Sequence, residues 1–479
     1  MEIKNKSTTL DRIPFFAAAL CAGFSIYFAI VTDRQWILNG VDQIKVYFTM
    51  PSYPDHQEAS EVQGAKELGP ILIAKENLDT TQDELIDDSF NREFILNDLD
   101  GRISDTFSIH DDLKDRVAFW FDVYTKYDSN KRIIHIAKMP WVVFKVVDVT
   151  PIIEAPKPSR RWMRNEKAEK FVMYELSFIK KALKTISRKK RFTQLNPYEE
   201  LVFNQLKKLP GKIQRNAKMA LSELRVQTGQ RDHFHGGLVL SSRYLGKMEE
   251  IFSKNGLPTE LTRLPLVESS FNMQATSKVG AAGIWQFVES TGKEFLKISD
   301  EIDERRSPIK SSEAAALLLK ENHLILHRSW PLAVTAWNHG PTGLRVAMKK
   351  TRSRELTKIV NEYRSKMFDF ASSNFYAEFL AALYAEQYSD ILFGKVDKEA
   401  PLQFLSYKTS RTMRTDLLFK ATGLTEDEFL LYNPELETAL KRKIKLPRGF
   451  LFHVPIEAKS NLGNRVAKEI LPNSSKKSS

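Results

Sequence analysis

Nearly half of the chain carries the hydrophobic spacing of α-helices, and this pattern constrains the fold most. Over residues 164–253 apolar side chains recur every three or four positions, as they do at Ile179, Leu183 and Ile186. The same character continues to about residue 390, where it is punctuated by glycines. The sequence therefore predicts a mainly α protein.

Two shorter stretches have the β-branched and aromatic composition of strands. Ile133–Ile136 and Trp141–Val149 are separated by a Met-Pro pair, which predicts two strands and a turn. Near the C-terminus, the strand-like segments Phe404–Tyr407 and Phe450–Val454 enclose two helical segments. We therefore expect a small α+β segment before the helical part and a small β-α-α-β module after it.

The predicted domain organisation follows from these changes in composition. The region before the first strands is polar and acidic in stretches, and the tail is rich in serine and lysine. The predicted segments are an N-terminal anchor (1–34), a polar linker (35–110), a small α+β segment (111–160), a helical region (161–253), a helical domain (254–395), a β-α-α-β module (400–457) and a disordered tail (458–479).

Charge and cysteine content exclude several classes of function. The 479 residues carry a formal net charge of +12, which favours a polyanionic partner. The single cysteine excludes a disulfide framework and a cysteine-based zinc site. His233 and His235 have no third ligand nearby, and no glycine loop for nucleotide phosphates is present. Zinc chemistry and a nucleotide cofactor therefore have no support in the sequence, and without a recognised motif we expect no nucleic acid partner.

The N-terminal run Ile13–Val31 is uncharged over 19 residues and follows Lys4, Lys6 and Arg12. As a helix it would span roughly 28 Å, close to the hydrocarbon thickness of a bilayer. The run predicts a signal anchor with a cytoplasmic N-terminus and an exported remainder. The alternatives are a cleaved signal sequence, a lipoprotein modified at Cys21 and a buried soluble helix.

One stretch near the middle of the chain has a pattern that suggests chemistry. Leu261, Leu264, Glu268 and Phe271 are spaced three, four and three apart, so a helix would place the glutamate on an apolar face. Burial disfavours the charged form of a carboxyl group and raises its pKa, as a general acid requires. The alternative is a glutamate at the edge of that face that reaches solvent or Arg263.

Small residues, an aromatic ring and an amide follow in Gly280–Gln286 (GAAGIWQ). Glycines allow a backbone to pass close to another group, and a ring with an amide suits the faces and hydroxyls of sugars. Trp337 and Asn338 supply a second ring and amide, and Asn374–Tyr376 a third. Each alone is more typical of a turn or of a core aromatic residue.

Five blocks follow one another along the chain: LPLVESSFN (264–272), GIWQF (283–287), DERRSP (303–308), SWPLAVTAWNHG (329–340) and SSNFYAEFLAAL (372–383). Taken in this order, they resemble the lysozyme-like domain of the soluble-type lytic transglycosylases, glycoside hydrolase family 23. The resemblance covers about residues 232–385 and implies a lysozyme-like helical catalytic domain.

The C-terminal module, residues 401–455, resembles LysM, a β-α-α-β fold that binds N-acetylglucosamine chains. Asn433-Pro434 and the closing segment Leu446–Pro455 carry this resemblance. Arg411–Thr415 stands where the Gly-Asp-Thr of such modules is usual, so we transfer no sugar-binding role to that segment.

The family resemblance implies roles for particular residues. Glu268 matches the catalytic glutamate of the family. Where the family usually has tyrosine this chain has Trp337, so we transfer no polar role to that ring. The residues that match positions near the substrate or the catalytic carboxyl are Ser277, Gln286, Asn338 and Tyr376.

The resemblance further implies cleavage of the β-1,4 bond between N-acetylmuramic acid and N-acetylglucosamine, with Glu268 as general acid and then base. The product would be a 1,6-anhydromuramoyl end, and the enzyme would lie in the cell envelope, anchored in the membrane with its catalytic domain in the periplasm. One alternative is a hydrolytic muramidase, which needs a second carboxylate such as Glu289, Asp300 or Asp303. Another is a non-catalytic scaffold that binds peptidoglycan.

Overall fold

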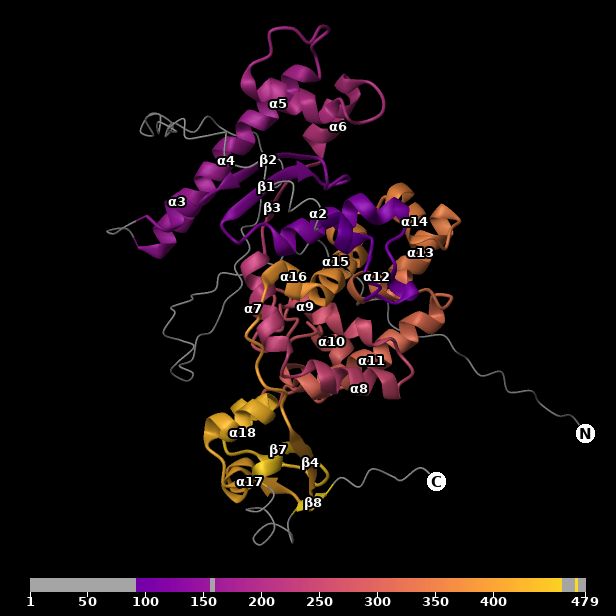
Figure 1. The fold of residues 1–479 in the computed structure, drawn as a ribbon. Helices are drawn as coiled ribbons and strands as arrows, with labels where there is room; N and C mark the ends of the chain where they lie inside the picture. Colours follow the sequence, from indigo (N-terminus) through magenta and orange to yellow (C-terminus); the bar gives the residue numbers. More distant parts are fainter. Residues whose placement is uncertain (1–91, 156–159, 459–469, 473–479) are drawn as a thin grey trace, which may run out of the picture. The chain divides into compact units, whose positions relative to one another are not determined.

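Figure 1 shows the computed structural model of the chain, which describes residues 92–155, 160–458 and 470–472. The predicted anchor lies outside these residues and stays a prediction. Across the described ranges, no helix is long and apolar enough to cross a membrane. Contacts divide the chain into two compact units, and Leu319–Phe375 is the described part of the smaller one.

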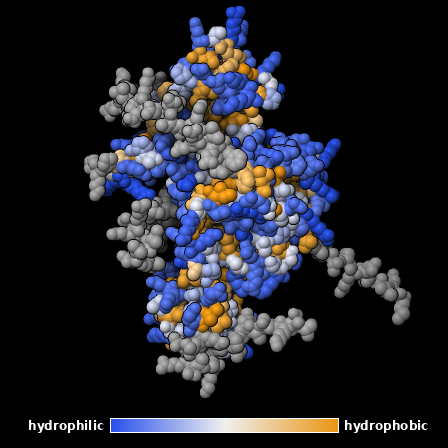
Figure 2. Space-filling view, viewed as in Figure 1, coloured by the Kyte–Doolittle hydropathy of each residue, from blue (hydrophilic) through white to orange (hydrophobic). Residues whose placement is uncertain are grey.

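Helices dominate the described residues, which confirms the predicted mainly α fold class. The strands form three small antiparallel sheets, with the orders β2-β1-β3, β7-β4-β8 and β5-β6. Figure 2 shows hydrophilic residues over most of the visible face and apolar residues in separate patches. On this face the hydrophilic residues of the described part of the chain cover the surface, as in an ordinary globular protein.

The first sheet contains the two strands that the sequence predicts and one that it does not. β1 (Lys131–Ile136) lies in the middle and pairs with β2 (Val143–Asp148) on one side. β3 (Leu224–Thr228) pairs with its other edge, about 90 residues later in the chain. This third strand is short and lies within a stretch of helical spacing, so its own pattern is too weak to predict it.

Three helices cover this sheet and form a core with it (Figure 1). They are α4 (Arg161–Ile186), α5 (Pro197–Leu206) and α6 (Ile213–Ser222). The predicted apolar stripe lies on α4, where Ile179 and Leu183 are wholly buried. A short helix, α3 (Thr150–Ile153), precedes α4.

The end of the predicted polar linker contains short helical turns. Residues 92–96 form a helical turn, and two 3₁₀ turns follow at Asp105–Phe107 (η2) and Asp111–Leu113 (η3). Asp98 accepts a hydrogen bond of 2.5 Å from the hydroxyl of Tyr388. Side-chain hydrogen bonds such as this one order a segment whose sequence has little hydrophobic periodicity.

The other helices of the larger unit have few residues each, apart from two long ones, α11 and α15, which continue into the smaller unit. In α15 the stretch 379–385 is buried on every side, so this helix lies within the core. These helices are α2 (Lys114–Thr125), α7 (Arg231–Ser241), α8 (Leu245–Lys254), η4 (Thr259–Arg263), α9 (Leu264–Glu268), α10 (Glu289–Gly292), η5 (Glu304–Arg306), α11 (Pro308–Ile325), α15 (Phe370–Gln387) and α16 (Ser389–Phe393).

The smaller unit contains three further helices, α12 (Trp330–His339), α13 (Pro341–Thr351) and α14 (Leu356–Glu362). Gly340, with φ at 81°, makes the turn between α12 and α13. A side chain is unfavourable at this backbone angle, so glycine suits the position.

The C-terminal module has strands at both ends and helices between them, in the predicted β-α-α-β order. Its last strand, β8, lies in the segment predicted to be a disordered tail and pairs with β4. The elements are β4 (Phe404–Thr409), β5 (Met413–Arg414), α17 (Thr415–Thr422), α18 (Glu426–Tyr432), η6 (Pro434–Leu436), α19 (Glu437–Lys441), β6 (Lys445–Leu446), β7 (Leu451–Pro455), η7 (Ile456–Ala458) and β8 (Ile470–Pro472).

A buried charge cluster joins this module to α11. The ammonium group of Lys310 lies 3.0 Å from the carboxylate of Glu304 and 2.6 Å from that of Glu435. All three side chains are nearly inaccessible to solvent. Buried charges are costly without a partner of opposite sign. Lys310 is the cation that pairs with both carboxylates, so the burial of their charges depends on it.

We predict that Lys310→Met destabilises the protein by about 3–5 kcal/mol, because it leaves buried carboxylates without their cation. Urea denaturation of the full-length chain measures the loss. The matched control is Lys441→Met, which removes an exposed pair with Glu437 and should cost less than about 1 kcal/mol. Equal losses in the two variants would show that the buried cluster contributes no more than a surface pair.

Candidate functional site

Glu268 is the last residue of α9, a helix of only five residues with Pro265 in its first turn. The chain then takes left-handed backbone angles at Ser270 (φ 48°) and Phe271 (φ 59°). The single continuous helical face that the spacing predicts is therefore absent. A 3₁₀ turn, a short α-helix and a left-handed turn together bury the same apolar residues.

The surroundings of Glu268 are apolar on its own helix and open on one side. Leu264 and Leu266 are buried, whereas Glu268 itself is partly exposed. The next residue, Ser269, is wholly buried and donates a hydrogen bond of 2.8 Å to the carbonyl oxygen of Ile284. This bond fixes the position of α9 against the loop that carries two of the predicted site residues. The alternative partner, Arg263, is instead bound by Glu386 and Glu249.

The loop of residues 275–287 is built around Ser277 and Gln286. The Ser277 hydroxyl accepts a hydrogen bond of 3.0 Å from the backbone N–H of Ala281. The Gln286 side-chain amide donates to the carbonyl oxygen of Gly283 at 2.8 Å. Both side chains are half-buried, so they hold the loop and keep part of their surface open to a ligand.

Gly283 is required where this loop passes η5. Its φ is +76°, and a Cβ there would lie 1.8 Å from the carbonyl oxygen of Arg305. The guanidinium of Arg305 in turn donates to the carbonyl oxygens of Gly280 (2.7 Å) and Phe287 (3.2 Å). The prediction of a close backbone approach at these glycines is therefore confirmed at Gly283.

Trp285 does not supply a face for a sugar. Its ring is wholly buried, stacks on Phe252 at 5.7 Å and donates a hydrogen bond of 2.9 Å to Ser312. The expectation of an accessible ring at this position is wrong, because the loop turns the tryptophan into the core and leaves the amide of Gln286 near the surface.

Glu378 is a candidate site residue that the sequence reasoning missed. It lies on α15, is half-buried, and makes no hydrogen bond or ion pair within the described part of the chain. Burial and the nearby negative charge of Glu268 raise its pKa to about 8, against a smaller opposing effect of Arg225. The sequence does distinguish Glu378, because it is the one charged residue in the apolar run Phe375–Ala385.

Tyr124 of α2 also belongs to this cluster. Burial, followed by the charges of Glu378 and Glu268, raises its pKa well above the usual value. Its ring stacks on Phe234 of α7 at 5.2 Å. The sequence of α2 is dense in aromatic residues, but it does not indicate that this helix lies near the two carboxyl groups, which depends on the fold. The α+β segment before the helical domain thus contributes a side chain to the candidate site.

The contact between α15 and the segment before Glu268 is fixed by a buried ion pair. The guanidinium of Arg263 lies 3.0 Å from the carboxylate of Glu386, and both side chains are almost inaccessible. The pair joins η4 to α15 at one point along each element. Glu268 lies five residues after Arg263 in the chain, and Glu378 lies eight residues before Glu386 on α15.

The remaining predicted residues, Tyr376 and Asn338, lie in different units. Tyr376 is 4% exposed on α15, and burial raises its pKa. Asn338, at the end of α12, accepts a hydrogen bond of 2.8 Å from Ser372 within the smaller unit. The structure therefore brings Ser277 and Gln286 together in one loop, and it leaves the roles of Tyr376 and Asn338 as predictions.

Other acidic residues considered for a second carboxylate have different partners. Glu289 bonds to Lys293 at 2.5 Å, and Asp303 bonds to Arg305 at 2.8 Å. Asp300 is exposed. In the described residues, no group of three histidine, cysteine, aspartate or glutamate side chains could hold a metal ion.

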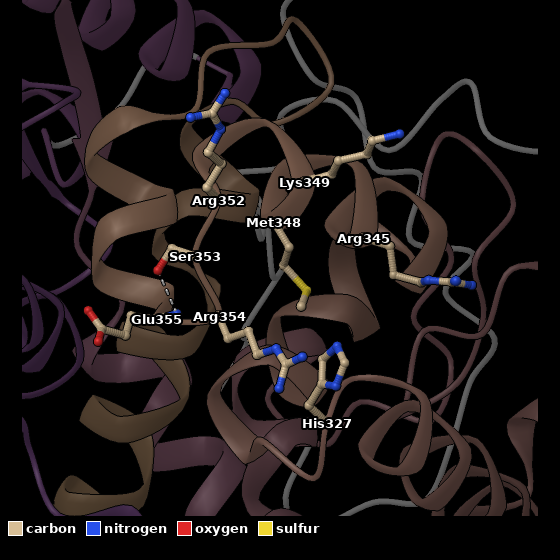
Figure 3. Close-up of a pocket in the computed structure, with 8 residues that line it drawn as sticks. All are labelled: His327, Arg345, Met348, Lys349, Arg352, Ser353, Arg354 and Glu355. Carbon is tan, nitrogen blue, oxygen red and sulfur yellow. Dashed lines mark hydrogen bonds between the residues drawn. The ribbon is translucent and has the colours of Figure 1, made fainter.

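A second candidate site is an open, basic pocket of about 630 Å³ in the smaller unit (Figure 3). Between residues 327 and 358 the sequence has seven lysines and arginines but only one acidic residue, Glu355. The arginines and lysine that line the pocket are exposed, as is suitable for contact with an oxyanion. The lining residues are His327, Arg345, Met348, Lys349, Arg352, Ser353, Arg354 and Glu355.

Comparison with known proteins supports the family resemblance. Residues 249–360 match the family described as Transglycosylase SLT domain. The chain is similar to the protein named "Membrane-bound lytic murein transglycosylase D" of Escherichia coli (strain K12), with 33% identity over 125 residues. A protein of the same name from a second Escherichia coli strain gives the same identity over the same length.

These matches cover 26% of this chain and 28% of each relative's length. They confirm the predicted resemblance to the lytic transglycosylases for the part that they cover. The matched family segment contains Glu268, Ser277, Gln286 and Asn338, whereas Tyr376 lies beyond its end. The C-terminal module also lies outside it, so its resemblance to LysM stays a prediction.

We predict that Gly283→Ala destabilises the protein by about 3 kcal/mol or more, because the new Cβ would overlap the Arg305 carbonyl. Chemical denaturation measures the change in the free energy of unfolding. Gly280→Ala is the matched control, since Gly280 also has a positive φ (78°) but no atom within 4 Å of a Cβ. That variant should lose only about 1–2 kcal/mol, and equal losses would contradict the close approach.

Proposed function

We propose that this chain is a lytic transglycosylase of peptidoglycan. In this proposal it cleaves the β-1,4 bond between N-acetylmuramic acid and N-acetylglucosamine and leaves a 1,6-anhydromuramoyl end. The observation that carries the proposal is Glu268, a partly exposed carboxyl at the end of an apolar helix within the matched domain. Two of the proteins to which the chain is similar are named as murein transglycosylases.

The proposed reaction needs one group that first gives and then takes a proton. Glu268, protonated, donates its proton to the bridging oxygen as the bond to the muramoyl anomeric carbon breaks. The sugar's own carbon-6 hydroxyl then attacks that carbon, and its proton passes to the Glu268 carboxylate. No water is consumed, and the attack is intramolecular, which favours it entropically.

A hydrolase on the same fold needs a protonated carboxyl and a second, ionised carboxylate that activates water or attacks the sugar. Burial and the negative charge of Glu268 raise the pKa of Glu378 to about 8. The proposed reaction needs no such pair, because Glu268 serves as acid and then as base, and the products of the digest below distinguish the two reactions.

The substrate-binding residues of the proposal are Ser277, Gln286, Asn338 and Tyr376, as the family resemblance implies. The half-buried hydroxyl and amide of Ser277 and Gln286 support it, because they lie in the loop bonded to α9. The protein would act in the cell envelope, attached by its N-terminal segment, with its catalytic domain in the periplasm.

We predict that the purified full-length chain releases 1,6-anhydromuropeptides from peptidoglycan, and that Glu268→Gln abolishes this release. Glutamine keeps the shape of the side chain but has no proton to donate to the bridging oxygen. Mass spectrometry of the digest identifies the products. The matched control is Glu294→Gln, which removes an exposed carboxylate of the same domain and should cleave as the wild type does.

Each result of this digest has a definite meaning. Products heavier by one water would replace the proposal with a hydrolytic muramidase. Binding to the wall without any products, in wild type and variant alike, would instead favour a non-catalytic scaffold.

The basic pocket of Figure 3 suits the same substrate, because the peptides of peptidoglycan carry free carboxylates. We predict that Arg345→Glu with Lys349→Glu weakens binding to purified sacculi several-fold at low salt, and less at high salt where charges are screened. Co-sedimentation at two salt concentrations measures the effect. Lys181→Glu with Lys184→Glu on α4 is the control of equal net charge. Equal weakening in both double variants would assign the effect to overall charge alone.

A further inference from the structure

The net charge of the chain lies in one part of the fold. Residues 160–222, which contain α4, α5 and α6, have 17 lysines and arginines but only five acidic residues. Their formal charge of +12 equals that of the whole chain, so the positive and negative residues of the remaining sequence balance. Like charges gathered in this way repel one another and destabilise the compact state. A partner of opposite charge would offset that repulsion.

The glutamates of this basic lobe (residues 160–222) do not neutralise it. Glu169 of α4 pairs with Arg132 of β1 at 3.0 Å. Glu175 of α4 pairs with Lys145 of β2 at 2.7 Å. Both carboxylates thus compensate cations of the sheet rather than those of the lobe. The exposed cations that make no ion pair within the described residues are Lys180, Lys181, Lys184, Arg188, Lys190 and Arg191.

The outer face of α4 also carries large apolar side chains. The inner face of this helix packs against the sheet and the helices α5 and α6 (Figure 1). On the outer face Trp162 is 60% exposed and Tyr174 55%, and Met163 and Met173 are exposed as well. Four such side chains on one helix form an apolar surface that the core of the lobe does not explain, and surfaces of this kind mark interaction sites.

The spacing of these residues places apolar and basic side chains on the same side of α4. Trp162, Met173 and Lys180 are separated by 11 and 7 residues, which is close to three and two whole helical turns. Each row therefore runs along the helix from two apolar side chains to a lysine. The second row, one position later in the chain, consists of Met163, Tyr174 and Lys181.

This combination favours a lipid surface over other polyanions. A nucleic acid or an acidic wall polymer would pair with the cations but offers no hydrocarbon phase for Trp162, Met163 and Met173. A bilayer with anionic phospholipids offers both phosphate groups and an apolar interior, and tryptophan and tyrosine favour the boundary between them. Lysine suits the same boundary, because its apolar stem can lie along the hydrocarbon while its ammonium reaches the head groups.

We propose that the outer face of α4 docks lengthwise on a membrane that contains anionic phospholipids. The four exposed apolar side chains enter the boundary between head groups and acyl chains, and the lysines at the C-terminal end of the helix bind lipid phosphates. This peripheral contact is additional to the predicted N-terminal anchor. It does not depend on the proposed enzymatic function, so the two proposals fail independently.

A fluorophore on the outer face of α4 tests whether the helix contacts lipid. The chain has a single cysteine, so Met173→Cys with Cys21→Ser in the full-length protein takes one label. A polarity-sensitive dye there should shift to shorter wavelength on vesicles that contain phosphatidylglycerol, but not on vesicles of phosphatidylcholine alone. The readout is local to α4, so insertion of the N-terminal segment into a vesicle does not produce it. High salt should reduce the shift, because it screens the charges.

Two double variants separate this surface from overall charge. Lys181→Glu with Lys184→Glu should lower the equilibrium constant of the contact, measured by raising the phosphatidylglycerol content, by about 25-fold or more, since each cation near an anionic surface contributes about fivefold. Arg345→Glu with Lys349→Glu changes the net charge equally outside the basic lobe and should leave the contact unchanged. All four cations are exposed, so both variants should fold as the wild type does.

Three outcomes would overturn the proposal. A dye signal that is absent on both kinds of vesicle, or equal on both, would show that α4 does not dock on anionic lipid. Equal losses in the two double variants would assign the contact to overall charge. Absence of lipid contact, together with binding of a DNA duplex that Lys181→Glu with Lys184→Glu removes, would assign this surface to nucleic acid instead.

Discussion

The structure around the candidate site depends on where α15 is held. This helix is buried on nearly every side, and the ion pair between Arg263 and Glu386 fixes it to the segment that ends in Glu268. Both partners of the pair are removed from water, so each needs the other, and slippage of either element would leave a buried charge without a partner.

The segment that follows Glu268 is fixed by backbone geometry, as α15 is fixed by the ion pair. The bond from Ser269 to Ile284 and the close passage of Gly283 past Arg305 fix the loop that carries Ser277 and Gln286. The hydroxyl of Ser277 and the amide of Gln286 make hydrogen bonds within the loop itself. A site built in this way is rigid before substrate arrives, which reduces the entropy lost on binding.

Charge is distributed differently in the two candidate sites. Near Glu268 the charges are few and partly buried, so their interactions act on proton affinity. In the basic pocket of the smaller unit the cations are exposed, where salt screens them and they serve attraction more than chemistry.

The sequence by itself determined the fold class, the strands β1, β2, β4 and β7 and the buried stripe of α4, because these depend on local periodicity. It also determined the identity of the matched domain, because the matching blocks are contiguous in the chain. It did not determine the break of the helix at Glu268, the burial of Trp285 or the strand β3. Only the tertiary structure decided that Tyr124 and Glu378 lie near Glu268, from segments more than 100 residues away. Proximity across such separations depends on packing, and a residue's own neighbours in the chain carry no record of it.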